Sequence, residues 1–535
     1  MLRNKKFVLM KLWKYFAVLL FLASCERVDV PSKPSDEDTA VYHGMIELGE
    51  KLENPYTVEN VTKAVESLYP ETKGRVNIDP TDMYVRFLPR TQEEYQRIES
   101  SVTAILDHPV DYRIVREGDY YHDPAVPEGQ ITWQYAVVPS DYVAPAGIEY
   151  ELIDQCYISE HDPLTRAGGA GVDWAAVERE AYRITGNEDM LEAHSGPVTK
   201  AATTPSGRIT VVDPLLNEGK PFGVAEILVV CNSFVKFSSS YTDRDGYYAL
   251  PVSFSGEPRY RLVFKNRRGF SLGFNLVLLP ASISTLGKGS PEGKDVSVLP
   301  TSDAWLYRRC AVNNAAYEYY TRCVENDLNI TPPPQNLNIW ILGGLKGSST
   351  LMLHHGVWAP PEQLSAKLGT YADLLSVFFP DITIGCGNAD DYSSLYTLTM
   401  HELSHSSHYV SVGNEYWQEY IKYVLRSFIY EGGDLYGSGA GEGAGRCEVG
   451  EIWAYFMDST MFKDRYGGSL PDTGTSYWFR PQILRYLYER GMTRGEIYRA
   501  LSPEVTDIKG LKEKLISLYP ERETQIRQVF NRYAH

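Results

Sequence analysis

Two histidines with a glutamate between them form the most chemically informative segment of the chain, His401-Glu402-Leu403-Ser404-His405. On a helix, residues i and i+4 share one face, so both imidazoles can reach a single metal ion. Zinc binds imidazole nitrogen at about 2 Å. A glutamate that lies beside the metal without binding it can accept a proton from a metal-activated water. The segment therefore predicts His401 and His405 as Zn²⁺ ligands and Glu402 as a general base.

The residues around this segment favour a helix. Four good N-cap residues lie just upstream: Asp390, Asp391, Ser393 and Ser394. No proline or glycine interrupts residues 392–410, so a helix that starts there carries both histidines in its interior. The alternative is an ordinary helix with two solvated histidines, but the uncharged residues next to them suit a helix buried behind a site.

A catalytic zinc ion needs a third protein ligand. His408 continues the same helix face, but it lies about 10 Å from His401 along a straight helix, too far for one ion to bridge. Glu448 and Glu451 open a helical segment after a glycine-rich stretch, and at i and i+3 they share a face. Either acid could instead be a helix-start carboxylate that the helix dipole favours. From the residues alone, the third ligand remains undecided among His408, Glu448 and Glu451.

The C-terminal stretch, residues 302–535, has an ordered succession of elements. We expect a helix over 304–326, strands over 337–342, 351–355 and 378–384, the His401–His405 helix, and only helices after residue 479. This order resembles the zincin metallopeptidases, and Glu451-Ile452-Trp453-Ala454 resembles the glutamate helix of the gluzincins. The resemblance implies His401, His405 and Glu451 as zinc ligands and Glu402 as the base, with Glu448 and His408 as alternative ligands.

Short strands separated by Asp-Gly and proline-containing turns fill residues 207–275, a pattern that predicts a β-sandwich. The Thr242-Asp243-Arg244-Asp245-Gly246-Tyr247-Tyr248 segment resembles the carboxypeptidase-regulatory-like domain, a small transthyretin-like sandwich that serves structural or docking roles. Asp243 and Asp245 could suggest calcium, but two carboxylates are too few for a ligand loop. Turn chemistry is the better explanation.

Residues 41–163 mix helical and strand-like segments and predict a small N-terminal α+β domain. Its role is either that of a propeptide-like cover or that of a partner-binding module. A helical connector and a Ser/Thr/Gly/Pro-rich linker follow over 164–206. The predicted fold class is therefore multidomain α+β: this domain, the transthyretin-like sandwich, and a zincin-type α+β domain with a helical C-terminal half.

The first 24 residues are typical of an export signal, with five basic residues before a short apolar core over 15–22. Leu22-Ala23-Ser24-Cys25 resembles the lipobox of bacterial lipoproteins, which implies cleavage before Cys25 and acylation of that residue. A plain secretory signal is the alternative. Residues 25–40 are proline-containing and highly charged, as expected of a tether. We expect a cell-envelope protein that is lipid-anchored to the outer membrane and faces either the periplasm or the surface.

Removal of residues 1–24 takes away five positive charges and changes the formal net charge from -17 to -22. A chain this acidic lacks the positive surface that binds nucleic acid. Its expected partners are a peptide or protein substrate and the lipid bilayer, which it contacts through acylated Cys25. Six further cysteines remain, an even number that permits disulfides in an oxidising compartment. A Cys386–Cys447 bridge would brace the site, and free buried thiols are the alternative.

Together these features predict a lipid-anchored zinc metallopeptidase that hydrolyses peptide bonds with Glu402 as general base. The alternative is a non-catalytic surface or adhesion lipoprotein with a vestigial or structural metal site. Glu402 argues for the enzyme, because a structural metal site needs no general base.

Overall fold

The chain has a mixed α+β fold, as predicted, with several separate sheets and a helical C-terminal part. The computed structural model describes residues 44–72, 78–127, 129–163, 171–191, 204–273, 283–325, 327–368, 379–431, 434–470 and 477–533. All residues before 44, which include the predicted export signal and Cys25, lie outside these ranges. Within them, no helix combines the length and the apolar character needed to cross a membrane.

An antiparallel three-stranded sheet, in the order β4-β2-β5, organises the N-terminal residues, and β1 pairs with β3 beside it. Val85 of β2 faces Ile98 of α3, whereas the neighbouring Tyr84 faces a different cluster, as alternation along a strand requires. Val177 of α5 packs with Val61 of α2, so the helix predicted as a connector belongs to this part. The elements are β1 (Glu47–Lys51), α2 (Val58–Leu68), β2 (Asp82–Leu88), α3 (Gln92–Ser101), β3 (Tyr112–Arg116), β4 (Gln134–Pro139), β5 (Glu149–Cys156) and α5 (Trp174–Ile184).

Two four-stranded sheets follow, and they share a core in which Ile209 of one sheet lies with Leu262 of the other. One sheet has the order β10-β6-β15 with β7 also on β6, and the other has the order β14-β11-β8-β9. The strands are β6 (Ser206–Val211), β7 (Phe222–Gly223), β8 (Leu228–Ser233), β9 (Lys236–Tyr241), β10 (Tyr247–Ala249), β11 (Arg259–Val263), β14 (Ile283–Lys288) and β15 (Val296–Val298). The two-sheet unit thus extends beyond the predicted boundary at residue 275.

The Asp-Gly turn between β9 and β10 has a local explanation. Asp243 Oδ1 accepts hydrogen bonds from the backbone N–H groups of Asp245 and Tyr247, both at 2.9 Å. Gly246 has a φ of 84°, and a Cβ atom there would lie 2.1 Å from the carbonyl oxygen of Ile209. The two aspartates therefore belong to a turn that only glycine can complete.

A five-stranded sheet, in the order β12-β13-β16-β18-β17, supports the C-terminal helices. Strands β13, β16 and β18 are parallel, and β17 pairs antiparallel with β18 at one edge. The strands are β12 (Lys265–Asn266), β13 (Phe270–Leu272), β16 (Leu337–Leu342), β17 (Ser349–Thr350) and β18 (Ile382–Gly385). The predicted strand 337–342 is confirmed, whereas β12 and β13 come from residues assigned to the preceding sandwich.

The predicted strand over 351–355 is wrong. The sheet ends at Thr350, because the N–H groups of Leu351 and Met352 both donate to the carbonyl oxygen of Asp381, at 2.7 and 2.9 Å. Met352 has a φ of 56°, which turns the chain out of the sheet plane. The strand predicted over 378–384 begins later, at Ile382, and residue 378 itself lies outside the described residues.

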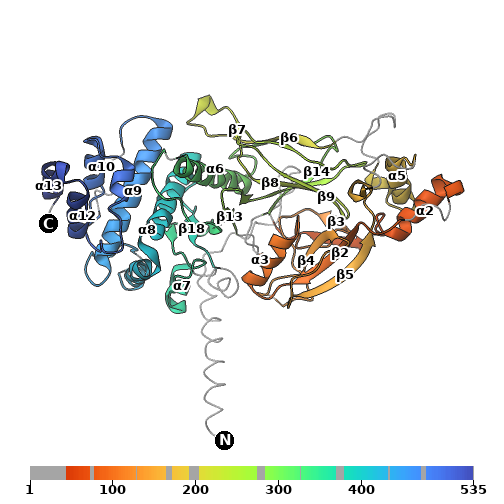
Figure 1. Ribbon diagram of the computed structural model, residues 1–535, viewed down its shortest axis with the longest axis horizontal. Coiled ribbons are helices and arrows are strands. Elements are labelled where there is room, and N and C mark those ends of the chain that lie inside the picture. The colour runs from red at the N-terminus through yellow and green to blue at the C-terminus, as the bar shows by residue number, and fades with distance from the viewer. Residues whose placement is uncertain are drawn as a thin grey trace, which may run out of the picture. The chain divides into compact units, whose positions relative to one another are not determined.

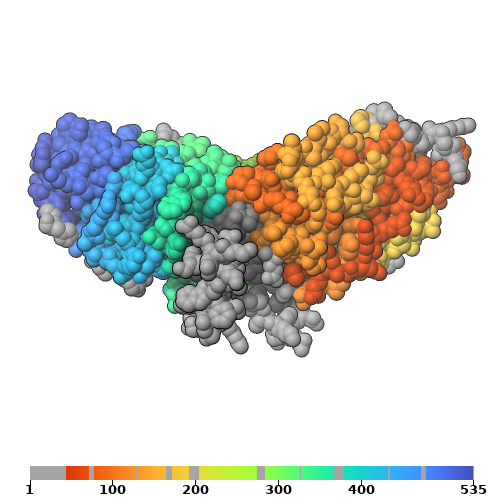
Figure 2. All heavy atoms as spheres, turned by 90° about the horizontal axis from the view of Figure 1, so that it is seen from below, coloured from red at the N-terminus to blue at the C-terminus, as the bar shows by residue number. Residues whose placement is uncertain are grey.

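Eight helices are described after residue 303: α6 (Ala304–Val324), α7 (Pro361–Leu368), α8 (Tyr392–Tyr430), α9 (Ala444–Tyr466), α10 (Gln482–Glu489), α11 (Arg494–Tyr498), α12 (Ile508–Leu518) and α13 (Glu523–Arg532). Figure 1 shows α8, α9, α10, α12 and α13 side by side, and their cyan to blue residues form one continuous mass in Figure 2. Helices α6 and α9 both pack against α8. The prediction that the chain is helical after residue 479 is confirmed.

All six described cysteines carry free thiols in buried positions: Cys156, Cys231, Cys310, Cys323, Cys386 and Cys447. The Cys386–Cys447 disulfide is therefore not formed, and the alternative of buried thiols holds. Burial raises the pKa of each of these thiols above its ordinary value, so the reactive thiolate form is disfavoured.

Buried ion pairs join the N-terminal part to the rest of the chain. Asp119 lies 3.0 Å from Arg309 of α6, and the two residues are 2% and 5% exposed. Lys236 of β9 lies 2.6 Å from Glu160 and 3.1 Å from Glu178, and it is 2% exposed. Leaving a buried cation without its counter-charge raises the free energy of the folded state. These ion pairs therefore hold the N-terminal part against the rest of the chain.

Replacing Asp119 with alanine should lower the free energy of unfolding by about 3–5 kcal/mol, because Arg309 stays buried without its counter-charge. Denaturant titration of purified protein measures this loss. The matched control is Asp189→Ala, which breaks a pair with Arg113 whose side chains are 41% and 52% exposed, and it should cost less than about 1 kcal/mol. Equal losses in the two variants would contradict the anchoring role of Asp119.

Candidate metal centre

Helix α8 carries the two histidines and Glu402 in its interior, as predicted. Asp391 is the N-cap, and its side chain accepts a hydrogen bond from Ser394 N at 2.9 Å. The helical geometry is broken only at Gly413, with a φ of 80°, beyond the His401–His405 segment. His401 and His405 therefore lie one turn apart on a regular stretch of helix, with their ring centroids 4.9 Å apart.

Helix α9 begins at Ala444, after the glycine-rich segment, and packs along α8. Trp453 Nε1 donates to the carbonyl oxygen of Ser404 at 3.0 Å and ties the two helices together. A Cβ atom at Gly450 would lie 3.5 Å from the Tyr420 ring and 3.8 Å from the His405 ring, so no side chain intervenes there. This close approach brings Glu451 of α9 to the histidines of α8.

Three potential ligand atoms converge between these helices. His401 Nε2 lies 3.2 Å from His405 Nε2. Glu451 Oε2 lies 3.4 Å from His401 Nε2, and Glu451 Oε1 lies 3.5 Å from His405 Nε2. In the part of the chain that the structure describes, this is the only group of three such residues that could hold a metal ion. A tetrahedral ion with bonds of about 2 Å separates its ligand atoms by about 3.3 Å. The observed spacings fit that geometry.

The protonation pattern of the site suits a cation. Asp458 Oδ2 lies 2.9 Å from His401 Nδ1. Because a carboxylate only accepts, the neutral ring of His401 would keep its proton on Nδ1 and present the Nε2 lone pair to a metal ion. Burial alone would lower the pKa of His401, but Asp458 and Glu451 outweigh it and raise this pKa well above its ordinary value. The carboxylates thus stabilise positive charge at this position.

Glu451 is a buried acceptor with one oxygen unsatisfied. Burial acts to raise its pKa, but the His405 and His401 imidazoles lower it well below the usual range, so the carboxylate is ionised. Tyr420 donates to Oε1 at 2.6 Å, whereas Oε2 is buried without a hydrogen-bond partner among the described residues. An ionised oxygen buried in this way needs a positive charge beside it, which the protonated His401 ring or a bound metal would supply.

Glu402 lies beside the cluster and takes no part in it. Glu402 is 4% exposed, and burial raises the pKa of its carboxyl group above the ordinary value. Thr350 of β17 donates to its Oε2 at 2.7 Å. A carboxylate with a raised pKa accepts protons more readily, which suits a general base.

Glu448, the rival ligand, is not part of the cluster. Burial and the nearby Asp507 carboxylate raise its pKa to about 7, and Arg480 partly offsets them. The structure places it outside the group of His401, His405 and Glu451. Glu448 therefore lies near Asp507, the N-cap of α12, and is not grouped with the histidines.

His408, the other rival, is fully buried between aromatic rings. Its ring centroid lies 5.5 Å from that of Tyr416 and 5.6 Å from that of Trp417. Neither ring nitrogen has a hydrogen-bond partner among the described residues, and burial lowers its pKa to about 3. His408 is thus a neutral core residue that the structure does not bring to the other two histidines.

Three partly buried tyrosines adjoin the cluster. The Tyr455 ring, one turn after Glu451 on α9, lies 4.7 Å from the His401 ring. Its hydroxyl lies 3.0 Å from that of Tyr436, and the Tyr477 ring packs 5.5 Å from its own ring. These rings provide aromatic surface and hydroxyl groups next to His401.

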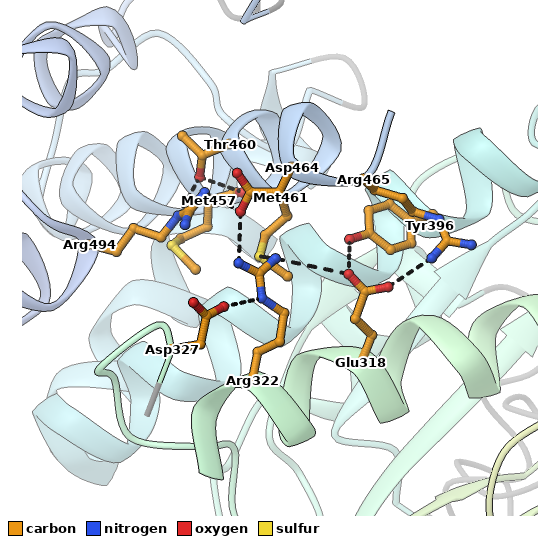
Figure 3. A network of polar contacts seen from close by, with 10 residues as sticks. All are labelled: Glu318, Arg322, Asp327, Tyr396, Met457, Thr460, Met461, Asp464, Arg465 and Arg494. Atoms are coloured by element: carbon orange, nitrogen blue, oxygen red, sulfur yellow. Dashed lines mark hydrogen bonds and ion pairs between the residues drawn. The ribbon is translucent and has the colours of Figure 1, made fainter. Parts of the chain in front are cut away.

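The far end of α9 is fixed by a network of charged side chains (Figure 3). Asp464 of α9 accepts hydrogen bonds from Arg322 of α6 and Arg494 of α11, both at 2.8 Å. Glu318 of α6 accepts a hydrogen bond from Arg465 of α9 at 2.9 Å. These contacts hold α9 against α6. They therefore fix the position of Glu451 along the helix axis relative to the histidines.

Sequence reasoning missed three residues of the site: Thr350, Tyr420 and Asp458. Asp458 follows Glu451 by two helical turns, so helical spacing could have placed both carboxylates on one face. Tyr420 and Thr350 carry no comparable signal, because their roles depend on how α8 continues past Gly413 and on where β17 ends.

Comparisons with known proteins are uninformative for this chain: no protein-family model matches it, and neither the curated proteins nor the solved structures give a match.

If the cluster binds zinc, Glu451→Ala should abolish stoichiometric zinc binding, because it removes one of the three candidate ligands, whereas Glu448→Ala should retain one zinc per chain. Asp458→Asn should weaken zinc affinity by about 10- to 100-fold, since it disturbs the orientation of His401. Elemental analysis after dialysis and competition with a chromogenic chelator give these values. Zinc retained by Glu451→Ala but lost by Glu448→Ala would reverse the assignment.

Proposed function

We propose that this protein is a zinc-dependent metallopeptidase in which His401, His405 and Glu451 hold the metal and Glu402 is the general base. The observation that carries the proposal is the convergence of two imidazole nitrogens and one carboxylate between two packed helices, with nearest distances of 3.2 to 3.5 Å. Two imidazoles and one carboxylate are the ligand set of several catalytic zinc sites, which keep a further position open for water or substrate.

The residues around the metal have separable tasks. When bound, zinc polarises the scissile carbonyl and lowers the pKa of a bound water toward about 7. Glu402 accepts a proton from the attacking water and passes it to the nitrogen of the leaving amine. Asp458 keeps His401 in the tautomer that binds metal through Nε2, and Tyr420 orients Glu451 through its Oε1.

A non-catalytic lipoprotein with a structural or vestigial metal site is the second candidate. Structural zinc sites are usually closed by four protein ligands, whereas this group has three. A buried carboxylate at position 402 would also cost free energy without binding the metal. Both points favour the peptidase.

We propose acylation at Cys25 as the attachment to the outer membrane, with the tether leading to residue 41, on the strength of the lipobox-like Leu22-Ala23-Ser24-Cys25.

The two-sheet unit that begins at β6 would be the carboxypeptidase-regulatory-like module. Its Asp243–Gly246 turn and its two sheets sharing one core support this assignment.

Glu402→Gln should reduce peptide hydrolysis by at least about 10²-fold while leaving zinc content unchanged, because the amide cannot accept the proton from water. Mass spectrometry of a mixed peptide library incubated with each protein detects cleavage, and Glu448→Gln is the matched control. If wild type and Glu402→Gln each hold one zinc and neither cleaves any peptide, the peptidase proposal fails.

Cys25→Ser should block acylation, so the protein should move from the membrane fraction to the aqueous phase of a detergent partition. Metabolic labelling with a clickable fatty acid, followed by mass spectrometry of the N-terminal peptide, reports the modification. Ser35→Ala in the tether is the control and should remain labelled. Labelling of Cys25→Ser equal to that of the wild type would exclude this residue as the attachment point.

A further inference from the structure

The edge strand β17 places a hydroxyl group against the candidate general base. Thr350 Oγ1 lies 2.7 Å from Oε2 of Glu402 and 2.9 Å from the carbonyl oxygen of the same residue. Thr350 is 3% exposed and Glu402 is 4% exposed, so bulk water does not compete for this contact. It is the only hydrogen bond that the described residues make to the Glu402 carboxylate.

We propose that Thr350 is a positioning residue: by binding Oε2, it leaves Oε1 of Glu402 as the oxygen that takes the proton during hydrolysis. This inference rests on the proposed function. It adds a role for β17, whose two residues would otherwise only complete the edge of the sheet.

The sheet gives the Thr350 hydroxyl a fixed position. The backbone of Thr350 pairs with Ile382 of β18, and its carbonyl oxygen accepts a hydrogen bond from Trp417 Nε1 at 3.3 Å. A β-branched side chain has few χ1 rotamers, so the hydroxyl direction follows from the backbone. Glu402 has a longer and more flexible side chain, and the hydrogen bond from Thr350 selects one of its conformations.

The Thr350 hydroxyl can donate a hydrogen bond in both protonation states of Glu402. Proton transfer breaks one O–H bond of water, forms one O–H bond at Oε1 and leaves the carboxyl group neutral. A hydroxyl has a single proton to donate, and it can rotate from Oε2 to the carbonyl oxygen at 2.9 Å without movement of any heavy atom. When Glu402 passes its proton to the leaving amine, the hydroxyl returns to Oε2. The base is thus supported in both states.

The neighbouring residue offers a matched control. Ser349 precedes Thr350 on β17, so its side chain points to the other face of the strand. Its hydroxyl lies 2.8 Å from Thr383 Oγ1 and is likewise buried. Ser349→Ala therefore removes a buried hydrogen bond from the same strand without touching Glu402.

Steady-state kinetics on a peptide that the wild type cleaves would compare Thr350→Val, Thr350→Ser and Ser349→Ala, with zinc content measured for each. Thr350→Val should lower kcat on the order of 10²-fold with KM and zinc content unchanged, because the base is no longer held in its reactive geometry. Thr350→Ser should restore most of kcat, and Ser349→Ala should keep it. A wild-type kcat in Thr350→Val, or equal losses in the Val and Ser variants or in Ser349→Ala, would overturn the proposal.

Infrared spectroscopy tests the contact without relying on hydrolysis. The difference spectrum between a protein and its Glu402→Gln version isolates the Glu402 carboxylate band, and this band should shift in the Thr350→Val background but not in Ser349→Ala. An unshifted band overturns the positioning contact itself. A shifted band in a protein that cleaves no peptide shows that the proposed function has failed, and it overturns the catalytic meaning of the contact.

Discussion

The packing of α9 against α8 is the constraint on which the candidate centre depends. Neither helix holds the ligand set alone, since the imidazoles come from α8 and the carboxylate of Glu451 comes from α9. Gly450 keeps the helices close, and Trp453 ties α9 to the backbone of α8 at Ser404. A slide of one turn, about 5.4 Å, would remove Glu451 from the histidines altogether. The convergence of the three candidate ligands therefore depends on helix register as much as on residue identity.

Helix α6 links α9, and with it the position of Glu451, to the N-terminal part of the molecule. Near its start, Arg309 is bound by Asp119 of the N-terminal part, and near its end Arg322 binds Asp464 of α9. One helix thus contacts both the N-terminal part and the helix that supplies Glu451. In addition, Tyr466 at the end of α9 donates to Asp213, which follows β6, at 2.7 Å. The parts that look accessory in sequence therefore contribute to the geometry of the centre.

Local signals in the sequence were sufficient to predict the helix that carries the histidines and one strand of the sheet that supports it. The N-cap at Asp391 and the buried strand from Leu337 to Leu342 depend on neighbouring residues, so cap chemistry and apolar patterning predict them. Strand β17 could not be predicted in this way, because its two residues become a strand only by pairing with β18. The apolar run that starts at Leu351 misled the prediction, since the carbonyl of Asp381 diverts it from the sheet. Thr350 was missed for the same reason, because its partner Glu402 is distant in sequence.

The buried thiols have a consequence for how this protein matures. None of the six described cysteines forms a disulfide, and burial disfavours their thiolate form. The stability of the described fold must then come from its core and its buried ion pairs, which a reductant does not attack. Assembly of the centre needs no oxidant and no disulfide isomerase. The described part of the chain therefore reaches its fold without forming a disulfide, so an oxidising surrounding is not a condition for the packing that brings Glu451 to His401 and His405.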